Sequence, residues 1–272
     1  MTRPPRLRLL LGAVLLLSAV AFVPSTLIAD HAWGPYHWKR TSTNPVALTL
    51  GDNVSALWAP HFDQAVSEWD QSIVLALTPV AGATSPRACK PKSGKIEVCS
   101  EAYGQTGWLG LARIWVSGVH ITAASTQVND TYFVQYGAQY GYDTPEWRQF
   151  VMCQEIGHDF GLDHVDEAFD NPSQGTCMDY TNEPGGGGIY GPANTSPNGH
   201  DYEQLAIIYN HVDSSGGGGG RNNGAGRAII GGPQTGAAQS EWGRLIRQNG
   251  RAALYRLDLG NGEYVFTFVI RA

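Results

Sequence analysis

Charged residues, cysteines and long apolar runs are all scarce in this chain of 272 residues. Only 15% of the residues are charged, and the basic ones form neither a run nor a patch interleaved with aromatic residues, which argues against nucleic acid as a partner. Beyond the N-terminal segment, no stretch approaches the roughly 18–20 apolar residues that span a membrane. The motif G-x-S-x-G is absent, which argues against a hydrolase with a Ser-His-Asp triad.

The N-terminus has the pattern of a secretory signal peptide. Three arginines within the first eight residues precede an apolar stretch over residues 9–23, and residues 19–21 are small, with the spacing that signal peptidase reads. The competing interpretation is an uncleaved membrane anchor, but Pro24 interrupts the apolar character too early for a span. We therefore expect a signal peptide over residues 1–29, a secreted or extracellular protein, and no stable membrane insertion after cleavage.

Four cysteines in an exported chain indicate two disulfides. The sequence alone allows three pairings. We favour Cys89 with Cys99, which closes a short loop, and Cys153 with Cys177. A site in which thiolates bind zinc is the alternative, but the four residues contain no C-x-x-C pair, which argues against it.

A helix is predicted to start at Pro145, with Thr144 as its N-cap. In this helix Gln154 and His158 are four residues apart, so about one turn of roughly 100° steps returns both side chains to one face, where both can bind one ion. Glu155 lies one step round the helix, where its carboxylate can take a proton from a metal-bound water rather than bind the metal. Glu155 is therefore the candidate general base.

Gly161 and His164 complete the pattern Q-E-I-G-H-D-F-G-L-D-H, which begins at Gln154. Gly161 is placed to end the helix in the left-handed conformation, so that the chain doubles back and His164 approaches the ion from a second direction. The three ligands Gln154, His158 and His164 would leave one coordination position open, which separates a catalytic zinc from a closed structural one. Water bound there would lose its proton near neutral pH and attack a polarised peptide carbonyl.

This pattern and the segment Cys177-Met178-Asp179-Tyr180 resemble the metzincin clan of zinc metalloproteases, and among them the secreted bacterial matrixin-like proteins. In that clan H-E-x-x-H-x-x-G-x-x-H is followed by a tight turn whose methionine forms a hydrophobic floor beneath the metal, a role that the resemblance gives to Met178. In the astacin-like and serralysin-like branches, a tyrosine two residues later is an extra metal ligand, and Tyr180 holds that position. The alternative for Tyr180 is a packed ring with its hydroxyl bonded elsewhere.

Gln154 stands where the metzincin motif has its first histidine ligand. The formal charge of the site is unchanged, but an amide oxygen is a poorer zinc donor, and even an outer-shell loss costs on the order of 10–100-fold in affinity or activity. The retained base Glu155 favours a working enzyme, because a chain without metal has no chemical use for it. Two functions stay open: a secreted zinc-dependent endopeptidase, which we favour, and a catalytically inactive metzincin-like module that binds peptides.

The fold class that the resemblance implies is α+β. It consists of a metzincin-like catalytic domain with a twisted mixed sheet, an active-site helix and a small lower lobe with the Met turn, and a short C-terminal β appendage is added to it. Residue periodicity predicts strands at 46–50, 73–80, 110–116 and 125–129, and a helix that buries Trp58, Phe62, Ala65, Val66 and Trp69. By resemblance, residues 111–116 would be an edge strand that borders the cleft and pairs with an extended peptide or protein substrate.

The lower lobe is expected to run from residue 165 through the Met turn into a helix near residues 201–211. The remaining histidines are scattered without ligand spacing, and we expect surface or structural roles for them: His31, His37, His61, His120, His200 and His211. The resemblance to matrixins also permits structural calcium or a further zinc.

Glycine dominates residues 214–239 and predicts a flexible linker. Three strands are expected after it, at residues 242–248, 251–259 and 263–270. The predicted organisation is a signal peptide (1–29), a catalytic domain (30–213), a linker (214–240) and a small three-stranded β module (241–272). Docking on the catalytic domain, binding a surface polymer and assisting export are all open roles for this module.

Removal of the signal peptide leaves 15 basic and 24 acidic residues, a net charge near −9. A mildly acidic chain suits a soluble secreted protein and no nucleic acid partner. We expect a monomer.

Overall fold

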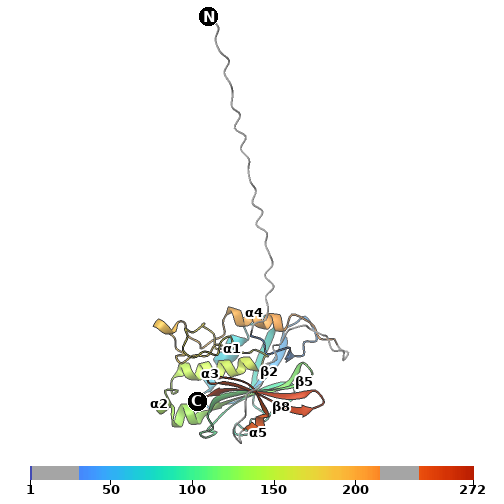
Figure 1. The fold of residues 1–272 in the computed structure, drawn as a ribbon. Coiled ribbons are helices and arrows are strands. Elements are labelled where there is room, and N and C mark those ends of the chain that lie inside the picture. The colour runs from blue at the N-terminus through green and yellow to red at the C-terminus, as the bar shows by residue number, and fades with distance from the viewer. Residues whose placement is uncertain (2–30, 215–238) are drawn as a thin grey trace.

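The computed structural model describes Met1, residues 31–214 and residues 239–272 (Figure 1). The predicted signal peptide over residues 1–29 and nearly all of the predicted linker over residues 214–240 lie outside this part of the chain, so both stay predictions.

A single mixed sheet joins the nine strands of the described residues. Eight of them lie in the order β3-β2-β4-β6-β5-β9-β8-β7, and a short ninth strand, β1, pairs with β6. The first four strands in this order pair in parallel, and the other four continue the sheet by antiparallel pairing. The strands are β1 (His37–Trp38), β2 (Val46–Asn53), β3 (Leu75–Ala81), β4 (Lys95–Glu101), β5 (Trp108–Ser117), β6 (His120–Asn129), β7 (Arg244–Asn249), β8 (Ala252–Gly260) and β9 (Glu263–Arg271).

Helices α1 (Ala59–Trp69) and α3 (Pro145–His158) pack against each other on one face of the sheet, and α4 (Gly199–Ile208) lies farther out (Figure 1). Shorter helical segments are η1 (Thr131–Gln135), α2 (Gly137–Tyr140), η2 (Gly188–Tyr190) and α5 (Gln239–Trp242). Within the described residues, no helix is both long enough and apolar enough to cross a membrane. The sheet with helices on one face is an α+β arrangement.

The core between the sheet and α1 follows the predicted helical spacing. Trp58, Phe62, Ala65, Val66 and Trp69 are all buried, as predicted. Burial of each large side chain stabilises the fold by about 1.5–3 kcal/mol. The positions that the hydrophobic pattern selected therefore hold α1 on the sheet.

Most elements predicted from periodicity are present with shifted ends. The strand predicted at 73–80 starts only at Leu75, because the Ile73 side chain faces solvent. The strand predicted at 125–129 is the second half of β6, and the helix predicted at 201–211 is α4. Strand β4 was missed because its charged residue Glu97 is buried, which hides the strand from a hydrophobic pattern.

The C-terminal strands do not form the separate appendage that the sequence suggested. Their predicted positions are nearly right, but β9 pairs along its whole length with β5, from Trp108 with Arg271 to Ser117 with Glu263. Residues 111–116, predicted to be a free edge strand, are therefore paired on both sides, and that prediction is wrong. The physical reason is that β9 carries apolar side chains on both of its faces. The predicted β module of about thirty residues, which has no disulfide, is too small to bury these side chains by itself.

Candidate active site

Helix α3 places the predicted site residues at its C-terminal end. The Thr144 hydroxyl accepts a hydrogen bond from the Trp147 N–H at 3.3 Å, and Pro145 begins the helix, as predicted. The last turns carry Gln154, Glu155 and His158, which are 0%, 1% and 1% exposed. The side chains that would do the chemistry are thus enclosed in the protein.

A sharp turn after α3 brings His164 back to His158. Gly161 has φ +94° and its Cα faces the carbonyl oxygen of Tyr36, so any side chain there would collide with the backbone. The chain then reverses, and His164 Nε2 lies 2.9 Å from His158 Nε2. The structure therefore brings together two of the three predicted ligands, His158 from α3 and His164 from the chain that reverses after it.

Hydrogen bonds on the far side of each ring orient these two nitrogens. His158 Nδ1 donates to the Leu162 carbonyl at 2.9 Å, and His164 Nδ1 donates to the Glu167 carboxylate at 3.0 Å. Burial, followed by the neighbouring His164, holds the pKa of His158 well below its usual value, so this imidazole is neutral. With each Nδ1 used as a donor, the two Nε2 atoms face each other across 2.9 Å. That arrangement is relieved by a shared cation, since two nitrogens on a tetrahedral zinc are about 3.3 Å apart.

Gln154, one helical turn before His158, has a buried amide whose nearby polar group is the Tyr180 hydroxyl. Burial raises the pKa of Tyr180 overall, and the interaction with this amide lowers it in part. Both Oε1 and Nε2 of Gln154 are nevertheless buried without a hydrogen-bond partner of good geometry. An unsatisfied buried polar group costs about 1–3 kcal/mol. A cation beside the histidines would satisfy the amide oxygen, so the donors present here fit a metal ion.

The carboxylate of Glu155 points toward strand β5, where Gly110 leaves room for it. A methyl group at Gly110 would lie 2.7 Å from Glu155 Oε1 and equally close to Val151. Glu155 Oε2 is buried without a hydrogen-bond partner. Burial, and secondarily the Asp159 carboxylate, raises the pKa of Glu155 well above its usual value, so this group readily holds a proton.

Met178 lies against helix α3 at Gly157, and Tyr180 packs against His164. The Met178 sulfur lies 2.5 Å from where a Cβ of Gly157 would be, so the methionine fits beneath α3 only because that helical residue is glycine. The Tyr180 ring packs edge-on against His164 at 4.5 Å, and its hydroxyl is 3.5 Å from the Val269 carbonyl of β9. Burial, and then the carboxylates of Glu155 and Glu167, raise the pKa of the Tyr180 hydroxyl. Its role as an extra ligand stays a prediction.

Strands β7 and β9 cover this site. The Phe268 ring stacks on the His158 ring, with centroids 4.2 Å apart and planes 11° from parallel. Arg247 Nη1 donates to Asp163 at 2.8 Å, and Arg247 Nη2 lies 3.1 Å from Glu167. Sequence reasoning missed Phe268 and Arg247, because nothing in the local pattern says that a segment about a hundred residues later returns to the motif.

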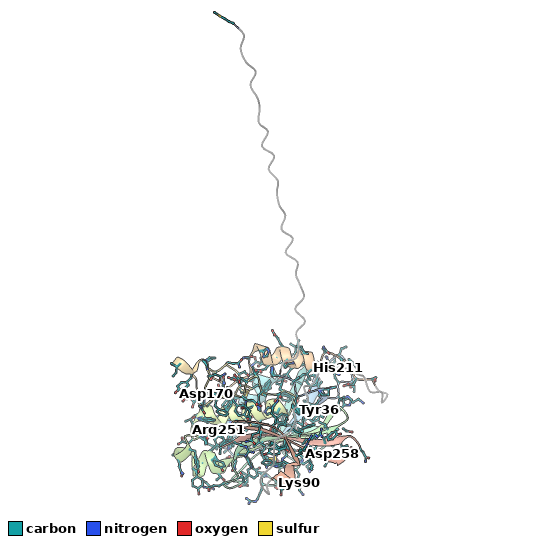
Figure 2. The ribbon with its side chains drawn as sticks, in the orientation of Figure 1. Tyr36, Lys90, Asp170, His211, Arg251 and Asp258 are labelled. Atoms are coloured by element: carbon teal, nitrogen blue, oxygen red, sulfur yellow. A yellow bond between two sulfur atoms is a disulfide. The ribbon has the colours of Figure 1, made fainter. Side chains whose placement is uncertain are left out.

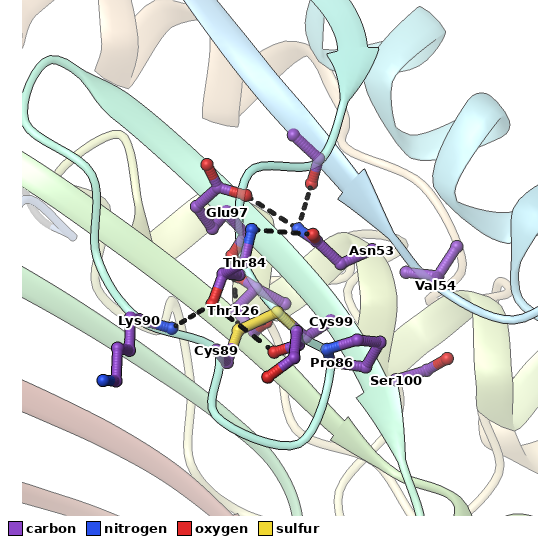
Figure 3. Close-up of a disulfide and its surroundings, with 12 residues drawn as sticks. Asn53, Val54, Thr84, Pro86, Cys89, Lys90, Glu97, Cys99, Ser100 and Thr126 are labelled. Atoms are coloured by element: carbon purple, nitrogen blue, oxygen red, sulfur yellow. Dashed lines mark hydrogen bonds between the residues drawn. A yellow bond between two sulfur atoms is a disulfide. The ribbon is translucent and has the colours of Figure 1, made fainter.

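Two disulfides brace the site and the sheet, in the pairing that we favoured. Cys153–Cys177 joins the residue before Gln154 to the residue before Met178 and so ties α3 to the Met turn. Cys89–Cys99 holds the loop before β4 to that strand (Figure 3). Two disulfides are compatible with a secreted protein.

Among the described residues, two groups of three or more side chains could hold a metal ion. One is Asp163, His164 and Glu167, where the two carboxylates lie beside His164 Nδ1 and the group does not include His158, and the other is His37, His120 and Asp213. Both contain histidine, a donor that suits zinc better than calcium. The structure gives no support to the calcium that the resemblance permitted.

Comparison with known proteins finds only a distant likeness. No protein-family model matches the sequence, and a search of curated proteins finds no match. Among solved structures, high choriolytic enzyme 1, a hatching-enzyme zinc protease from the medaka fish Oryzias latipes, is similar, with a TM-score of 0.32 and 11% sequence identity over 64% of this chain and 94% of that one. Because the likeness is so distant, the function has to be inferred from the residues themselves.

Proposed function

We propose that this chain is a secreted zinc-dependent endopeptidase of the metzincin type, resembling the bacterial matrixin-like proteins. The observation that carries the proposal is the unpartnered, fully buried amide of Gln154, one turn before a histidine whose Nε2 faces that of His164 at 2.9 Å. Gln154 Oε1, His158 Nε2 and His164 Nε2 would hold the ion. Bound zinc would supply polarisation of the peptide carbonyl and acidification of the attacking water.

Glu155 is the residue that moves the proton. Its Oε2 has no partner within the protein, so it can accept a proton from a water molecule that enters the site. Burial raises the pKa of Glu155, which favours the protonated carboxyl that would pass its proton to the leaving amine nitrogen. The Glu155 carboxyl would therefore act first as base and then as acid.

Substrate can reach these groups only if the C-terminal strands move. The side of β5 that would pair with an extended peptide is taken by β9, and Phe268 covers His158. The form described here is closed, and turnover requires β9 to separate from β5. A module that merely binds peptides is not favoured, because it would have no chemical use for the buried carboxylate of Glu155.

Secretion is part of the proposal. It is supported by the two disulfides of the described residues and by the signal-peptide pattern over residues 1–29.

The test combines zinc content with cleavage of an unstructured protein substrate. Wild type, Glu155→Gln and His158→Ala are compared, each also combined with Phe268→Ala so that a closed site is not mistaken for an inactive one. We expect Glu155→Gln to keep its zinc and lose cleavage, and His158→Ala to lose cleavage and the zinc ion of this site. Cleavage that survives Glu155→Gln, or zinc content that His158→Ala leaves unchanged, would overturn the proposal.

A further inference from the structure

Strand β9 shows how an extended chain lies over the candidate active site. It pairs antiparallel with β5, and directly opposite residues of such a pair carry their side chains on the same face of the sheet. Phe268 of β9 is opposite Ala112, and Ile270 is opposite Gly110. The large side chains of β9 thus meet the two smallest residues of β5, which leave room on the side of the sheet that faces α3.

The Phe268 ring fills a slot with three walls that do not belong to the C-terminal strands. The His158 ring lies nearly parallel to it, at 4.2 Å and 11°, and the Trp33 ring meets it edge-on, at 5.8 Å and 88°. The third wall is the buried Ala112. Leu254 of β8 pairs with Phe268 from the other side and would leave together with β9. A planar ring satisfies both ring contacts at once, whereas an aliphatic side chain has no face or edge to offer.

Trp33 belongs to a segment that is fixed to the turn after α3. Its backbone N–H donates to the Gly161 carbonyl at 2.9 Å, so this wall of the slot does not depend on β9 for its position. Figure 2 labels Tyr36 of the same segment, whose ring lies 4.8 Å from the ring of Phe266. Phe266 and Phe268 are two residues apart on β9 and therefore share one face of it. Aromatic side chains of the covering strand thus contact aromatic side chains of this segment.

The backbone that follows this slot lies over the candidate reacting groups. A Cβ at Gly110 would lie 2.7 Å from Glu155 Oε1, so Ile270, which pairs with Gly110, lies close to the candidate base. The Val269 carbonyl is 3.5 Å from the Tyr180 hydroxyl. A substrate strand that pairs with β5 as β9 does would therefore place its reacting peptide bond one or two residues after the aromatic side chain.

We propose that Trp33, Ala112 and His158 form a subsite for an aromatic side chain, and that the substrates are extended segments with an aromatic residue one or two residues before the cleaved bond. This inference rests on the proposed peptidase function and names the substrate class of the same site. In the closed form Phe268 occupies the subsite, and β9 acts as an internal inhibitor that a substrate strand has to replace. Because β9 is part of the same chain, a substrate competes with it at a high effective concentration.

The first experiment maps the bonds that the full chain carrying Phe268→Ala, with the subsite vacated, cleaves in a mixture of peptides from unfolded proteins. We expect aromatic residues to be enriched at one fixed position, one or two residues before the cleaved bond. Adding Trp33→Ala should lower this enrichment about two- to tenfold, because one of the two ring contacts is lost. The matched control is Trp242→Ala, which changes another partly buried tryptophan in a separate apolar cluster and should leave the enrichment unchanged. Cleavage without an aromatic preference, or a preference that Trp33→Ala does not alter, would overturn the proposal.

The second experiment measures binding without catalysis. A fluorescent peptide with the sequence of residues 263–271 is added to the full chain carrying both Phe268→Ala and Glu155→Gln, and fluorescence anisotropy gives the affinity. The same peptide with alanine in place of Phe268 should bind at least about tenfold more weakly. Equal affinity of the two peptides, or no binding of either, would overturn the subsite. Tighter binding of the aromatic peptide, without cleavage by any variant that retains Glu155, would support the subsite and refute the proposed peptidase function.

Discussion

Replacing Phe268 by alanine should increase the rate of substrate cleavage over that of wild type. The ring is 1% exposed, stacks on His158 and packs edge-on against Trp33 at 5.8 Å. Its removal takes away the side chain of β9 that lies directly over the candidate ligands, while the backbone pairing of Phe268 with Ala112 of β5 can persist. We therefore expect the closed form to weaken relative to the open one.

The magnitude follows from the size of the buried ring. Truncation of a buried phenylalanine to alanine costs about 3–5 kcal/mol. If the whole loss of about 3–5 kcal/mol fell on the closed form, the open population would rise by about two to three and a half powers of ten, at about 1.4 kcal/mol per tenfold change. Some of the loss falls instead on global stability, so we expect cleavage to increase by at least about tenfold.

The assay is cleavage of an unstructured protein, run beside amide hydrogen exchange of β9. Leu259→Ala is the matched control, because Leu259 is a large apolar side chain on β8 that is 51% exposed. Addition of Glu155→Gln should abolish the cleavage that Phe268→Ala releases. If β9 amides exchange faster in Phe268→Ala and cleavage still does not rise, covering by β9 is not what holds the site inactive.

Three further changes test the neighbouring parts of the site. Gly110→Ala should destabilise the fold by about 1–3 kcal/mol and lower cleavage about 10²-fold without loss of zinc, because the new methyl group crowds the carboxylate of Glu155, the candidate base. The control is Gly199→Ala, because a Cβ at Gly199 meets nothing within 4 Å. Equal effects of the two substitutions on urea unfolding and on cleavage would contradict this reasoning. Gln154→His should tighten zinc about 10- to 100-fold in competition with a chelator, since an imidazole is the better donor, and unchanged affinity would remove residue 154 from the ligand set. Replacement of both Cys153 and Cys177 by alanine should lower the free energy of unfolding in urea by about 3 kcal/mol, because the disulfide closes a loop of 24 residues in the unfolded chain. A loss near zero would show that this disulfide does not stabilise the fold.

Local spacing predicted the parts of the site that depend on a single turn of chain. The helix start at Thr144, the reversal at Gly161 and the approach of His164 to His158 follow from helix geometry and from the conformation that glycine permits. The buried residues of α1 also follow from their period. In each case the interacting residues are close in sequence, so the sequence pattern predicts how they are arranged.

Contacts between distant segments were decided only by the tertiary structure. The pattern of β9 predicted a strand but not its partner, because backbone hydrogen bonding does not depend on which side chains the neighbouring strand carries. In the sequence, His37, His120 and His211 look scattered because they belong to separate elements. Only folding brings all three to the carboxylate of Asp213. The sequence by itself thus identified the candidate ligands and the candidate base, and it favoured the disulfide pairing that the structure has. The packing of the described residues decided that β9 and Phe268 cover His158 and that His37, His120 and Asp213 lie together, because both depend on contacts between residues about 80 or more positions apart.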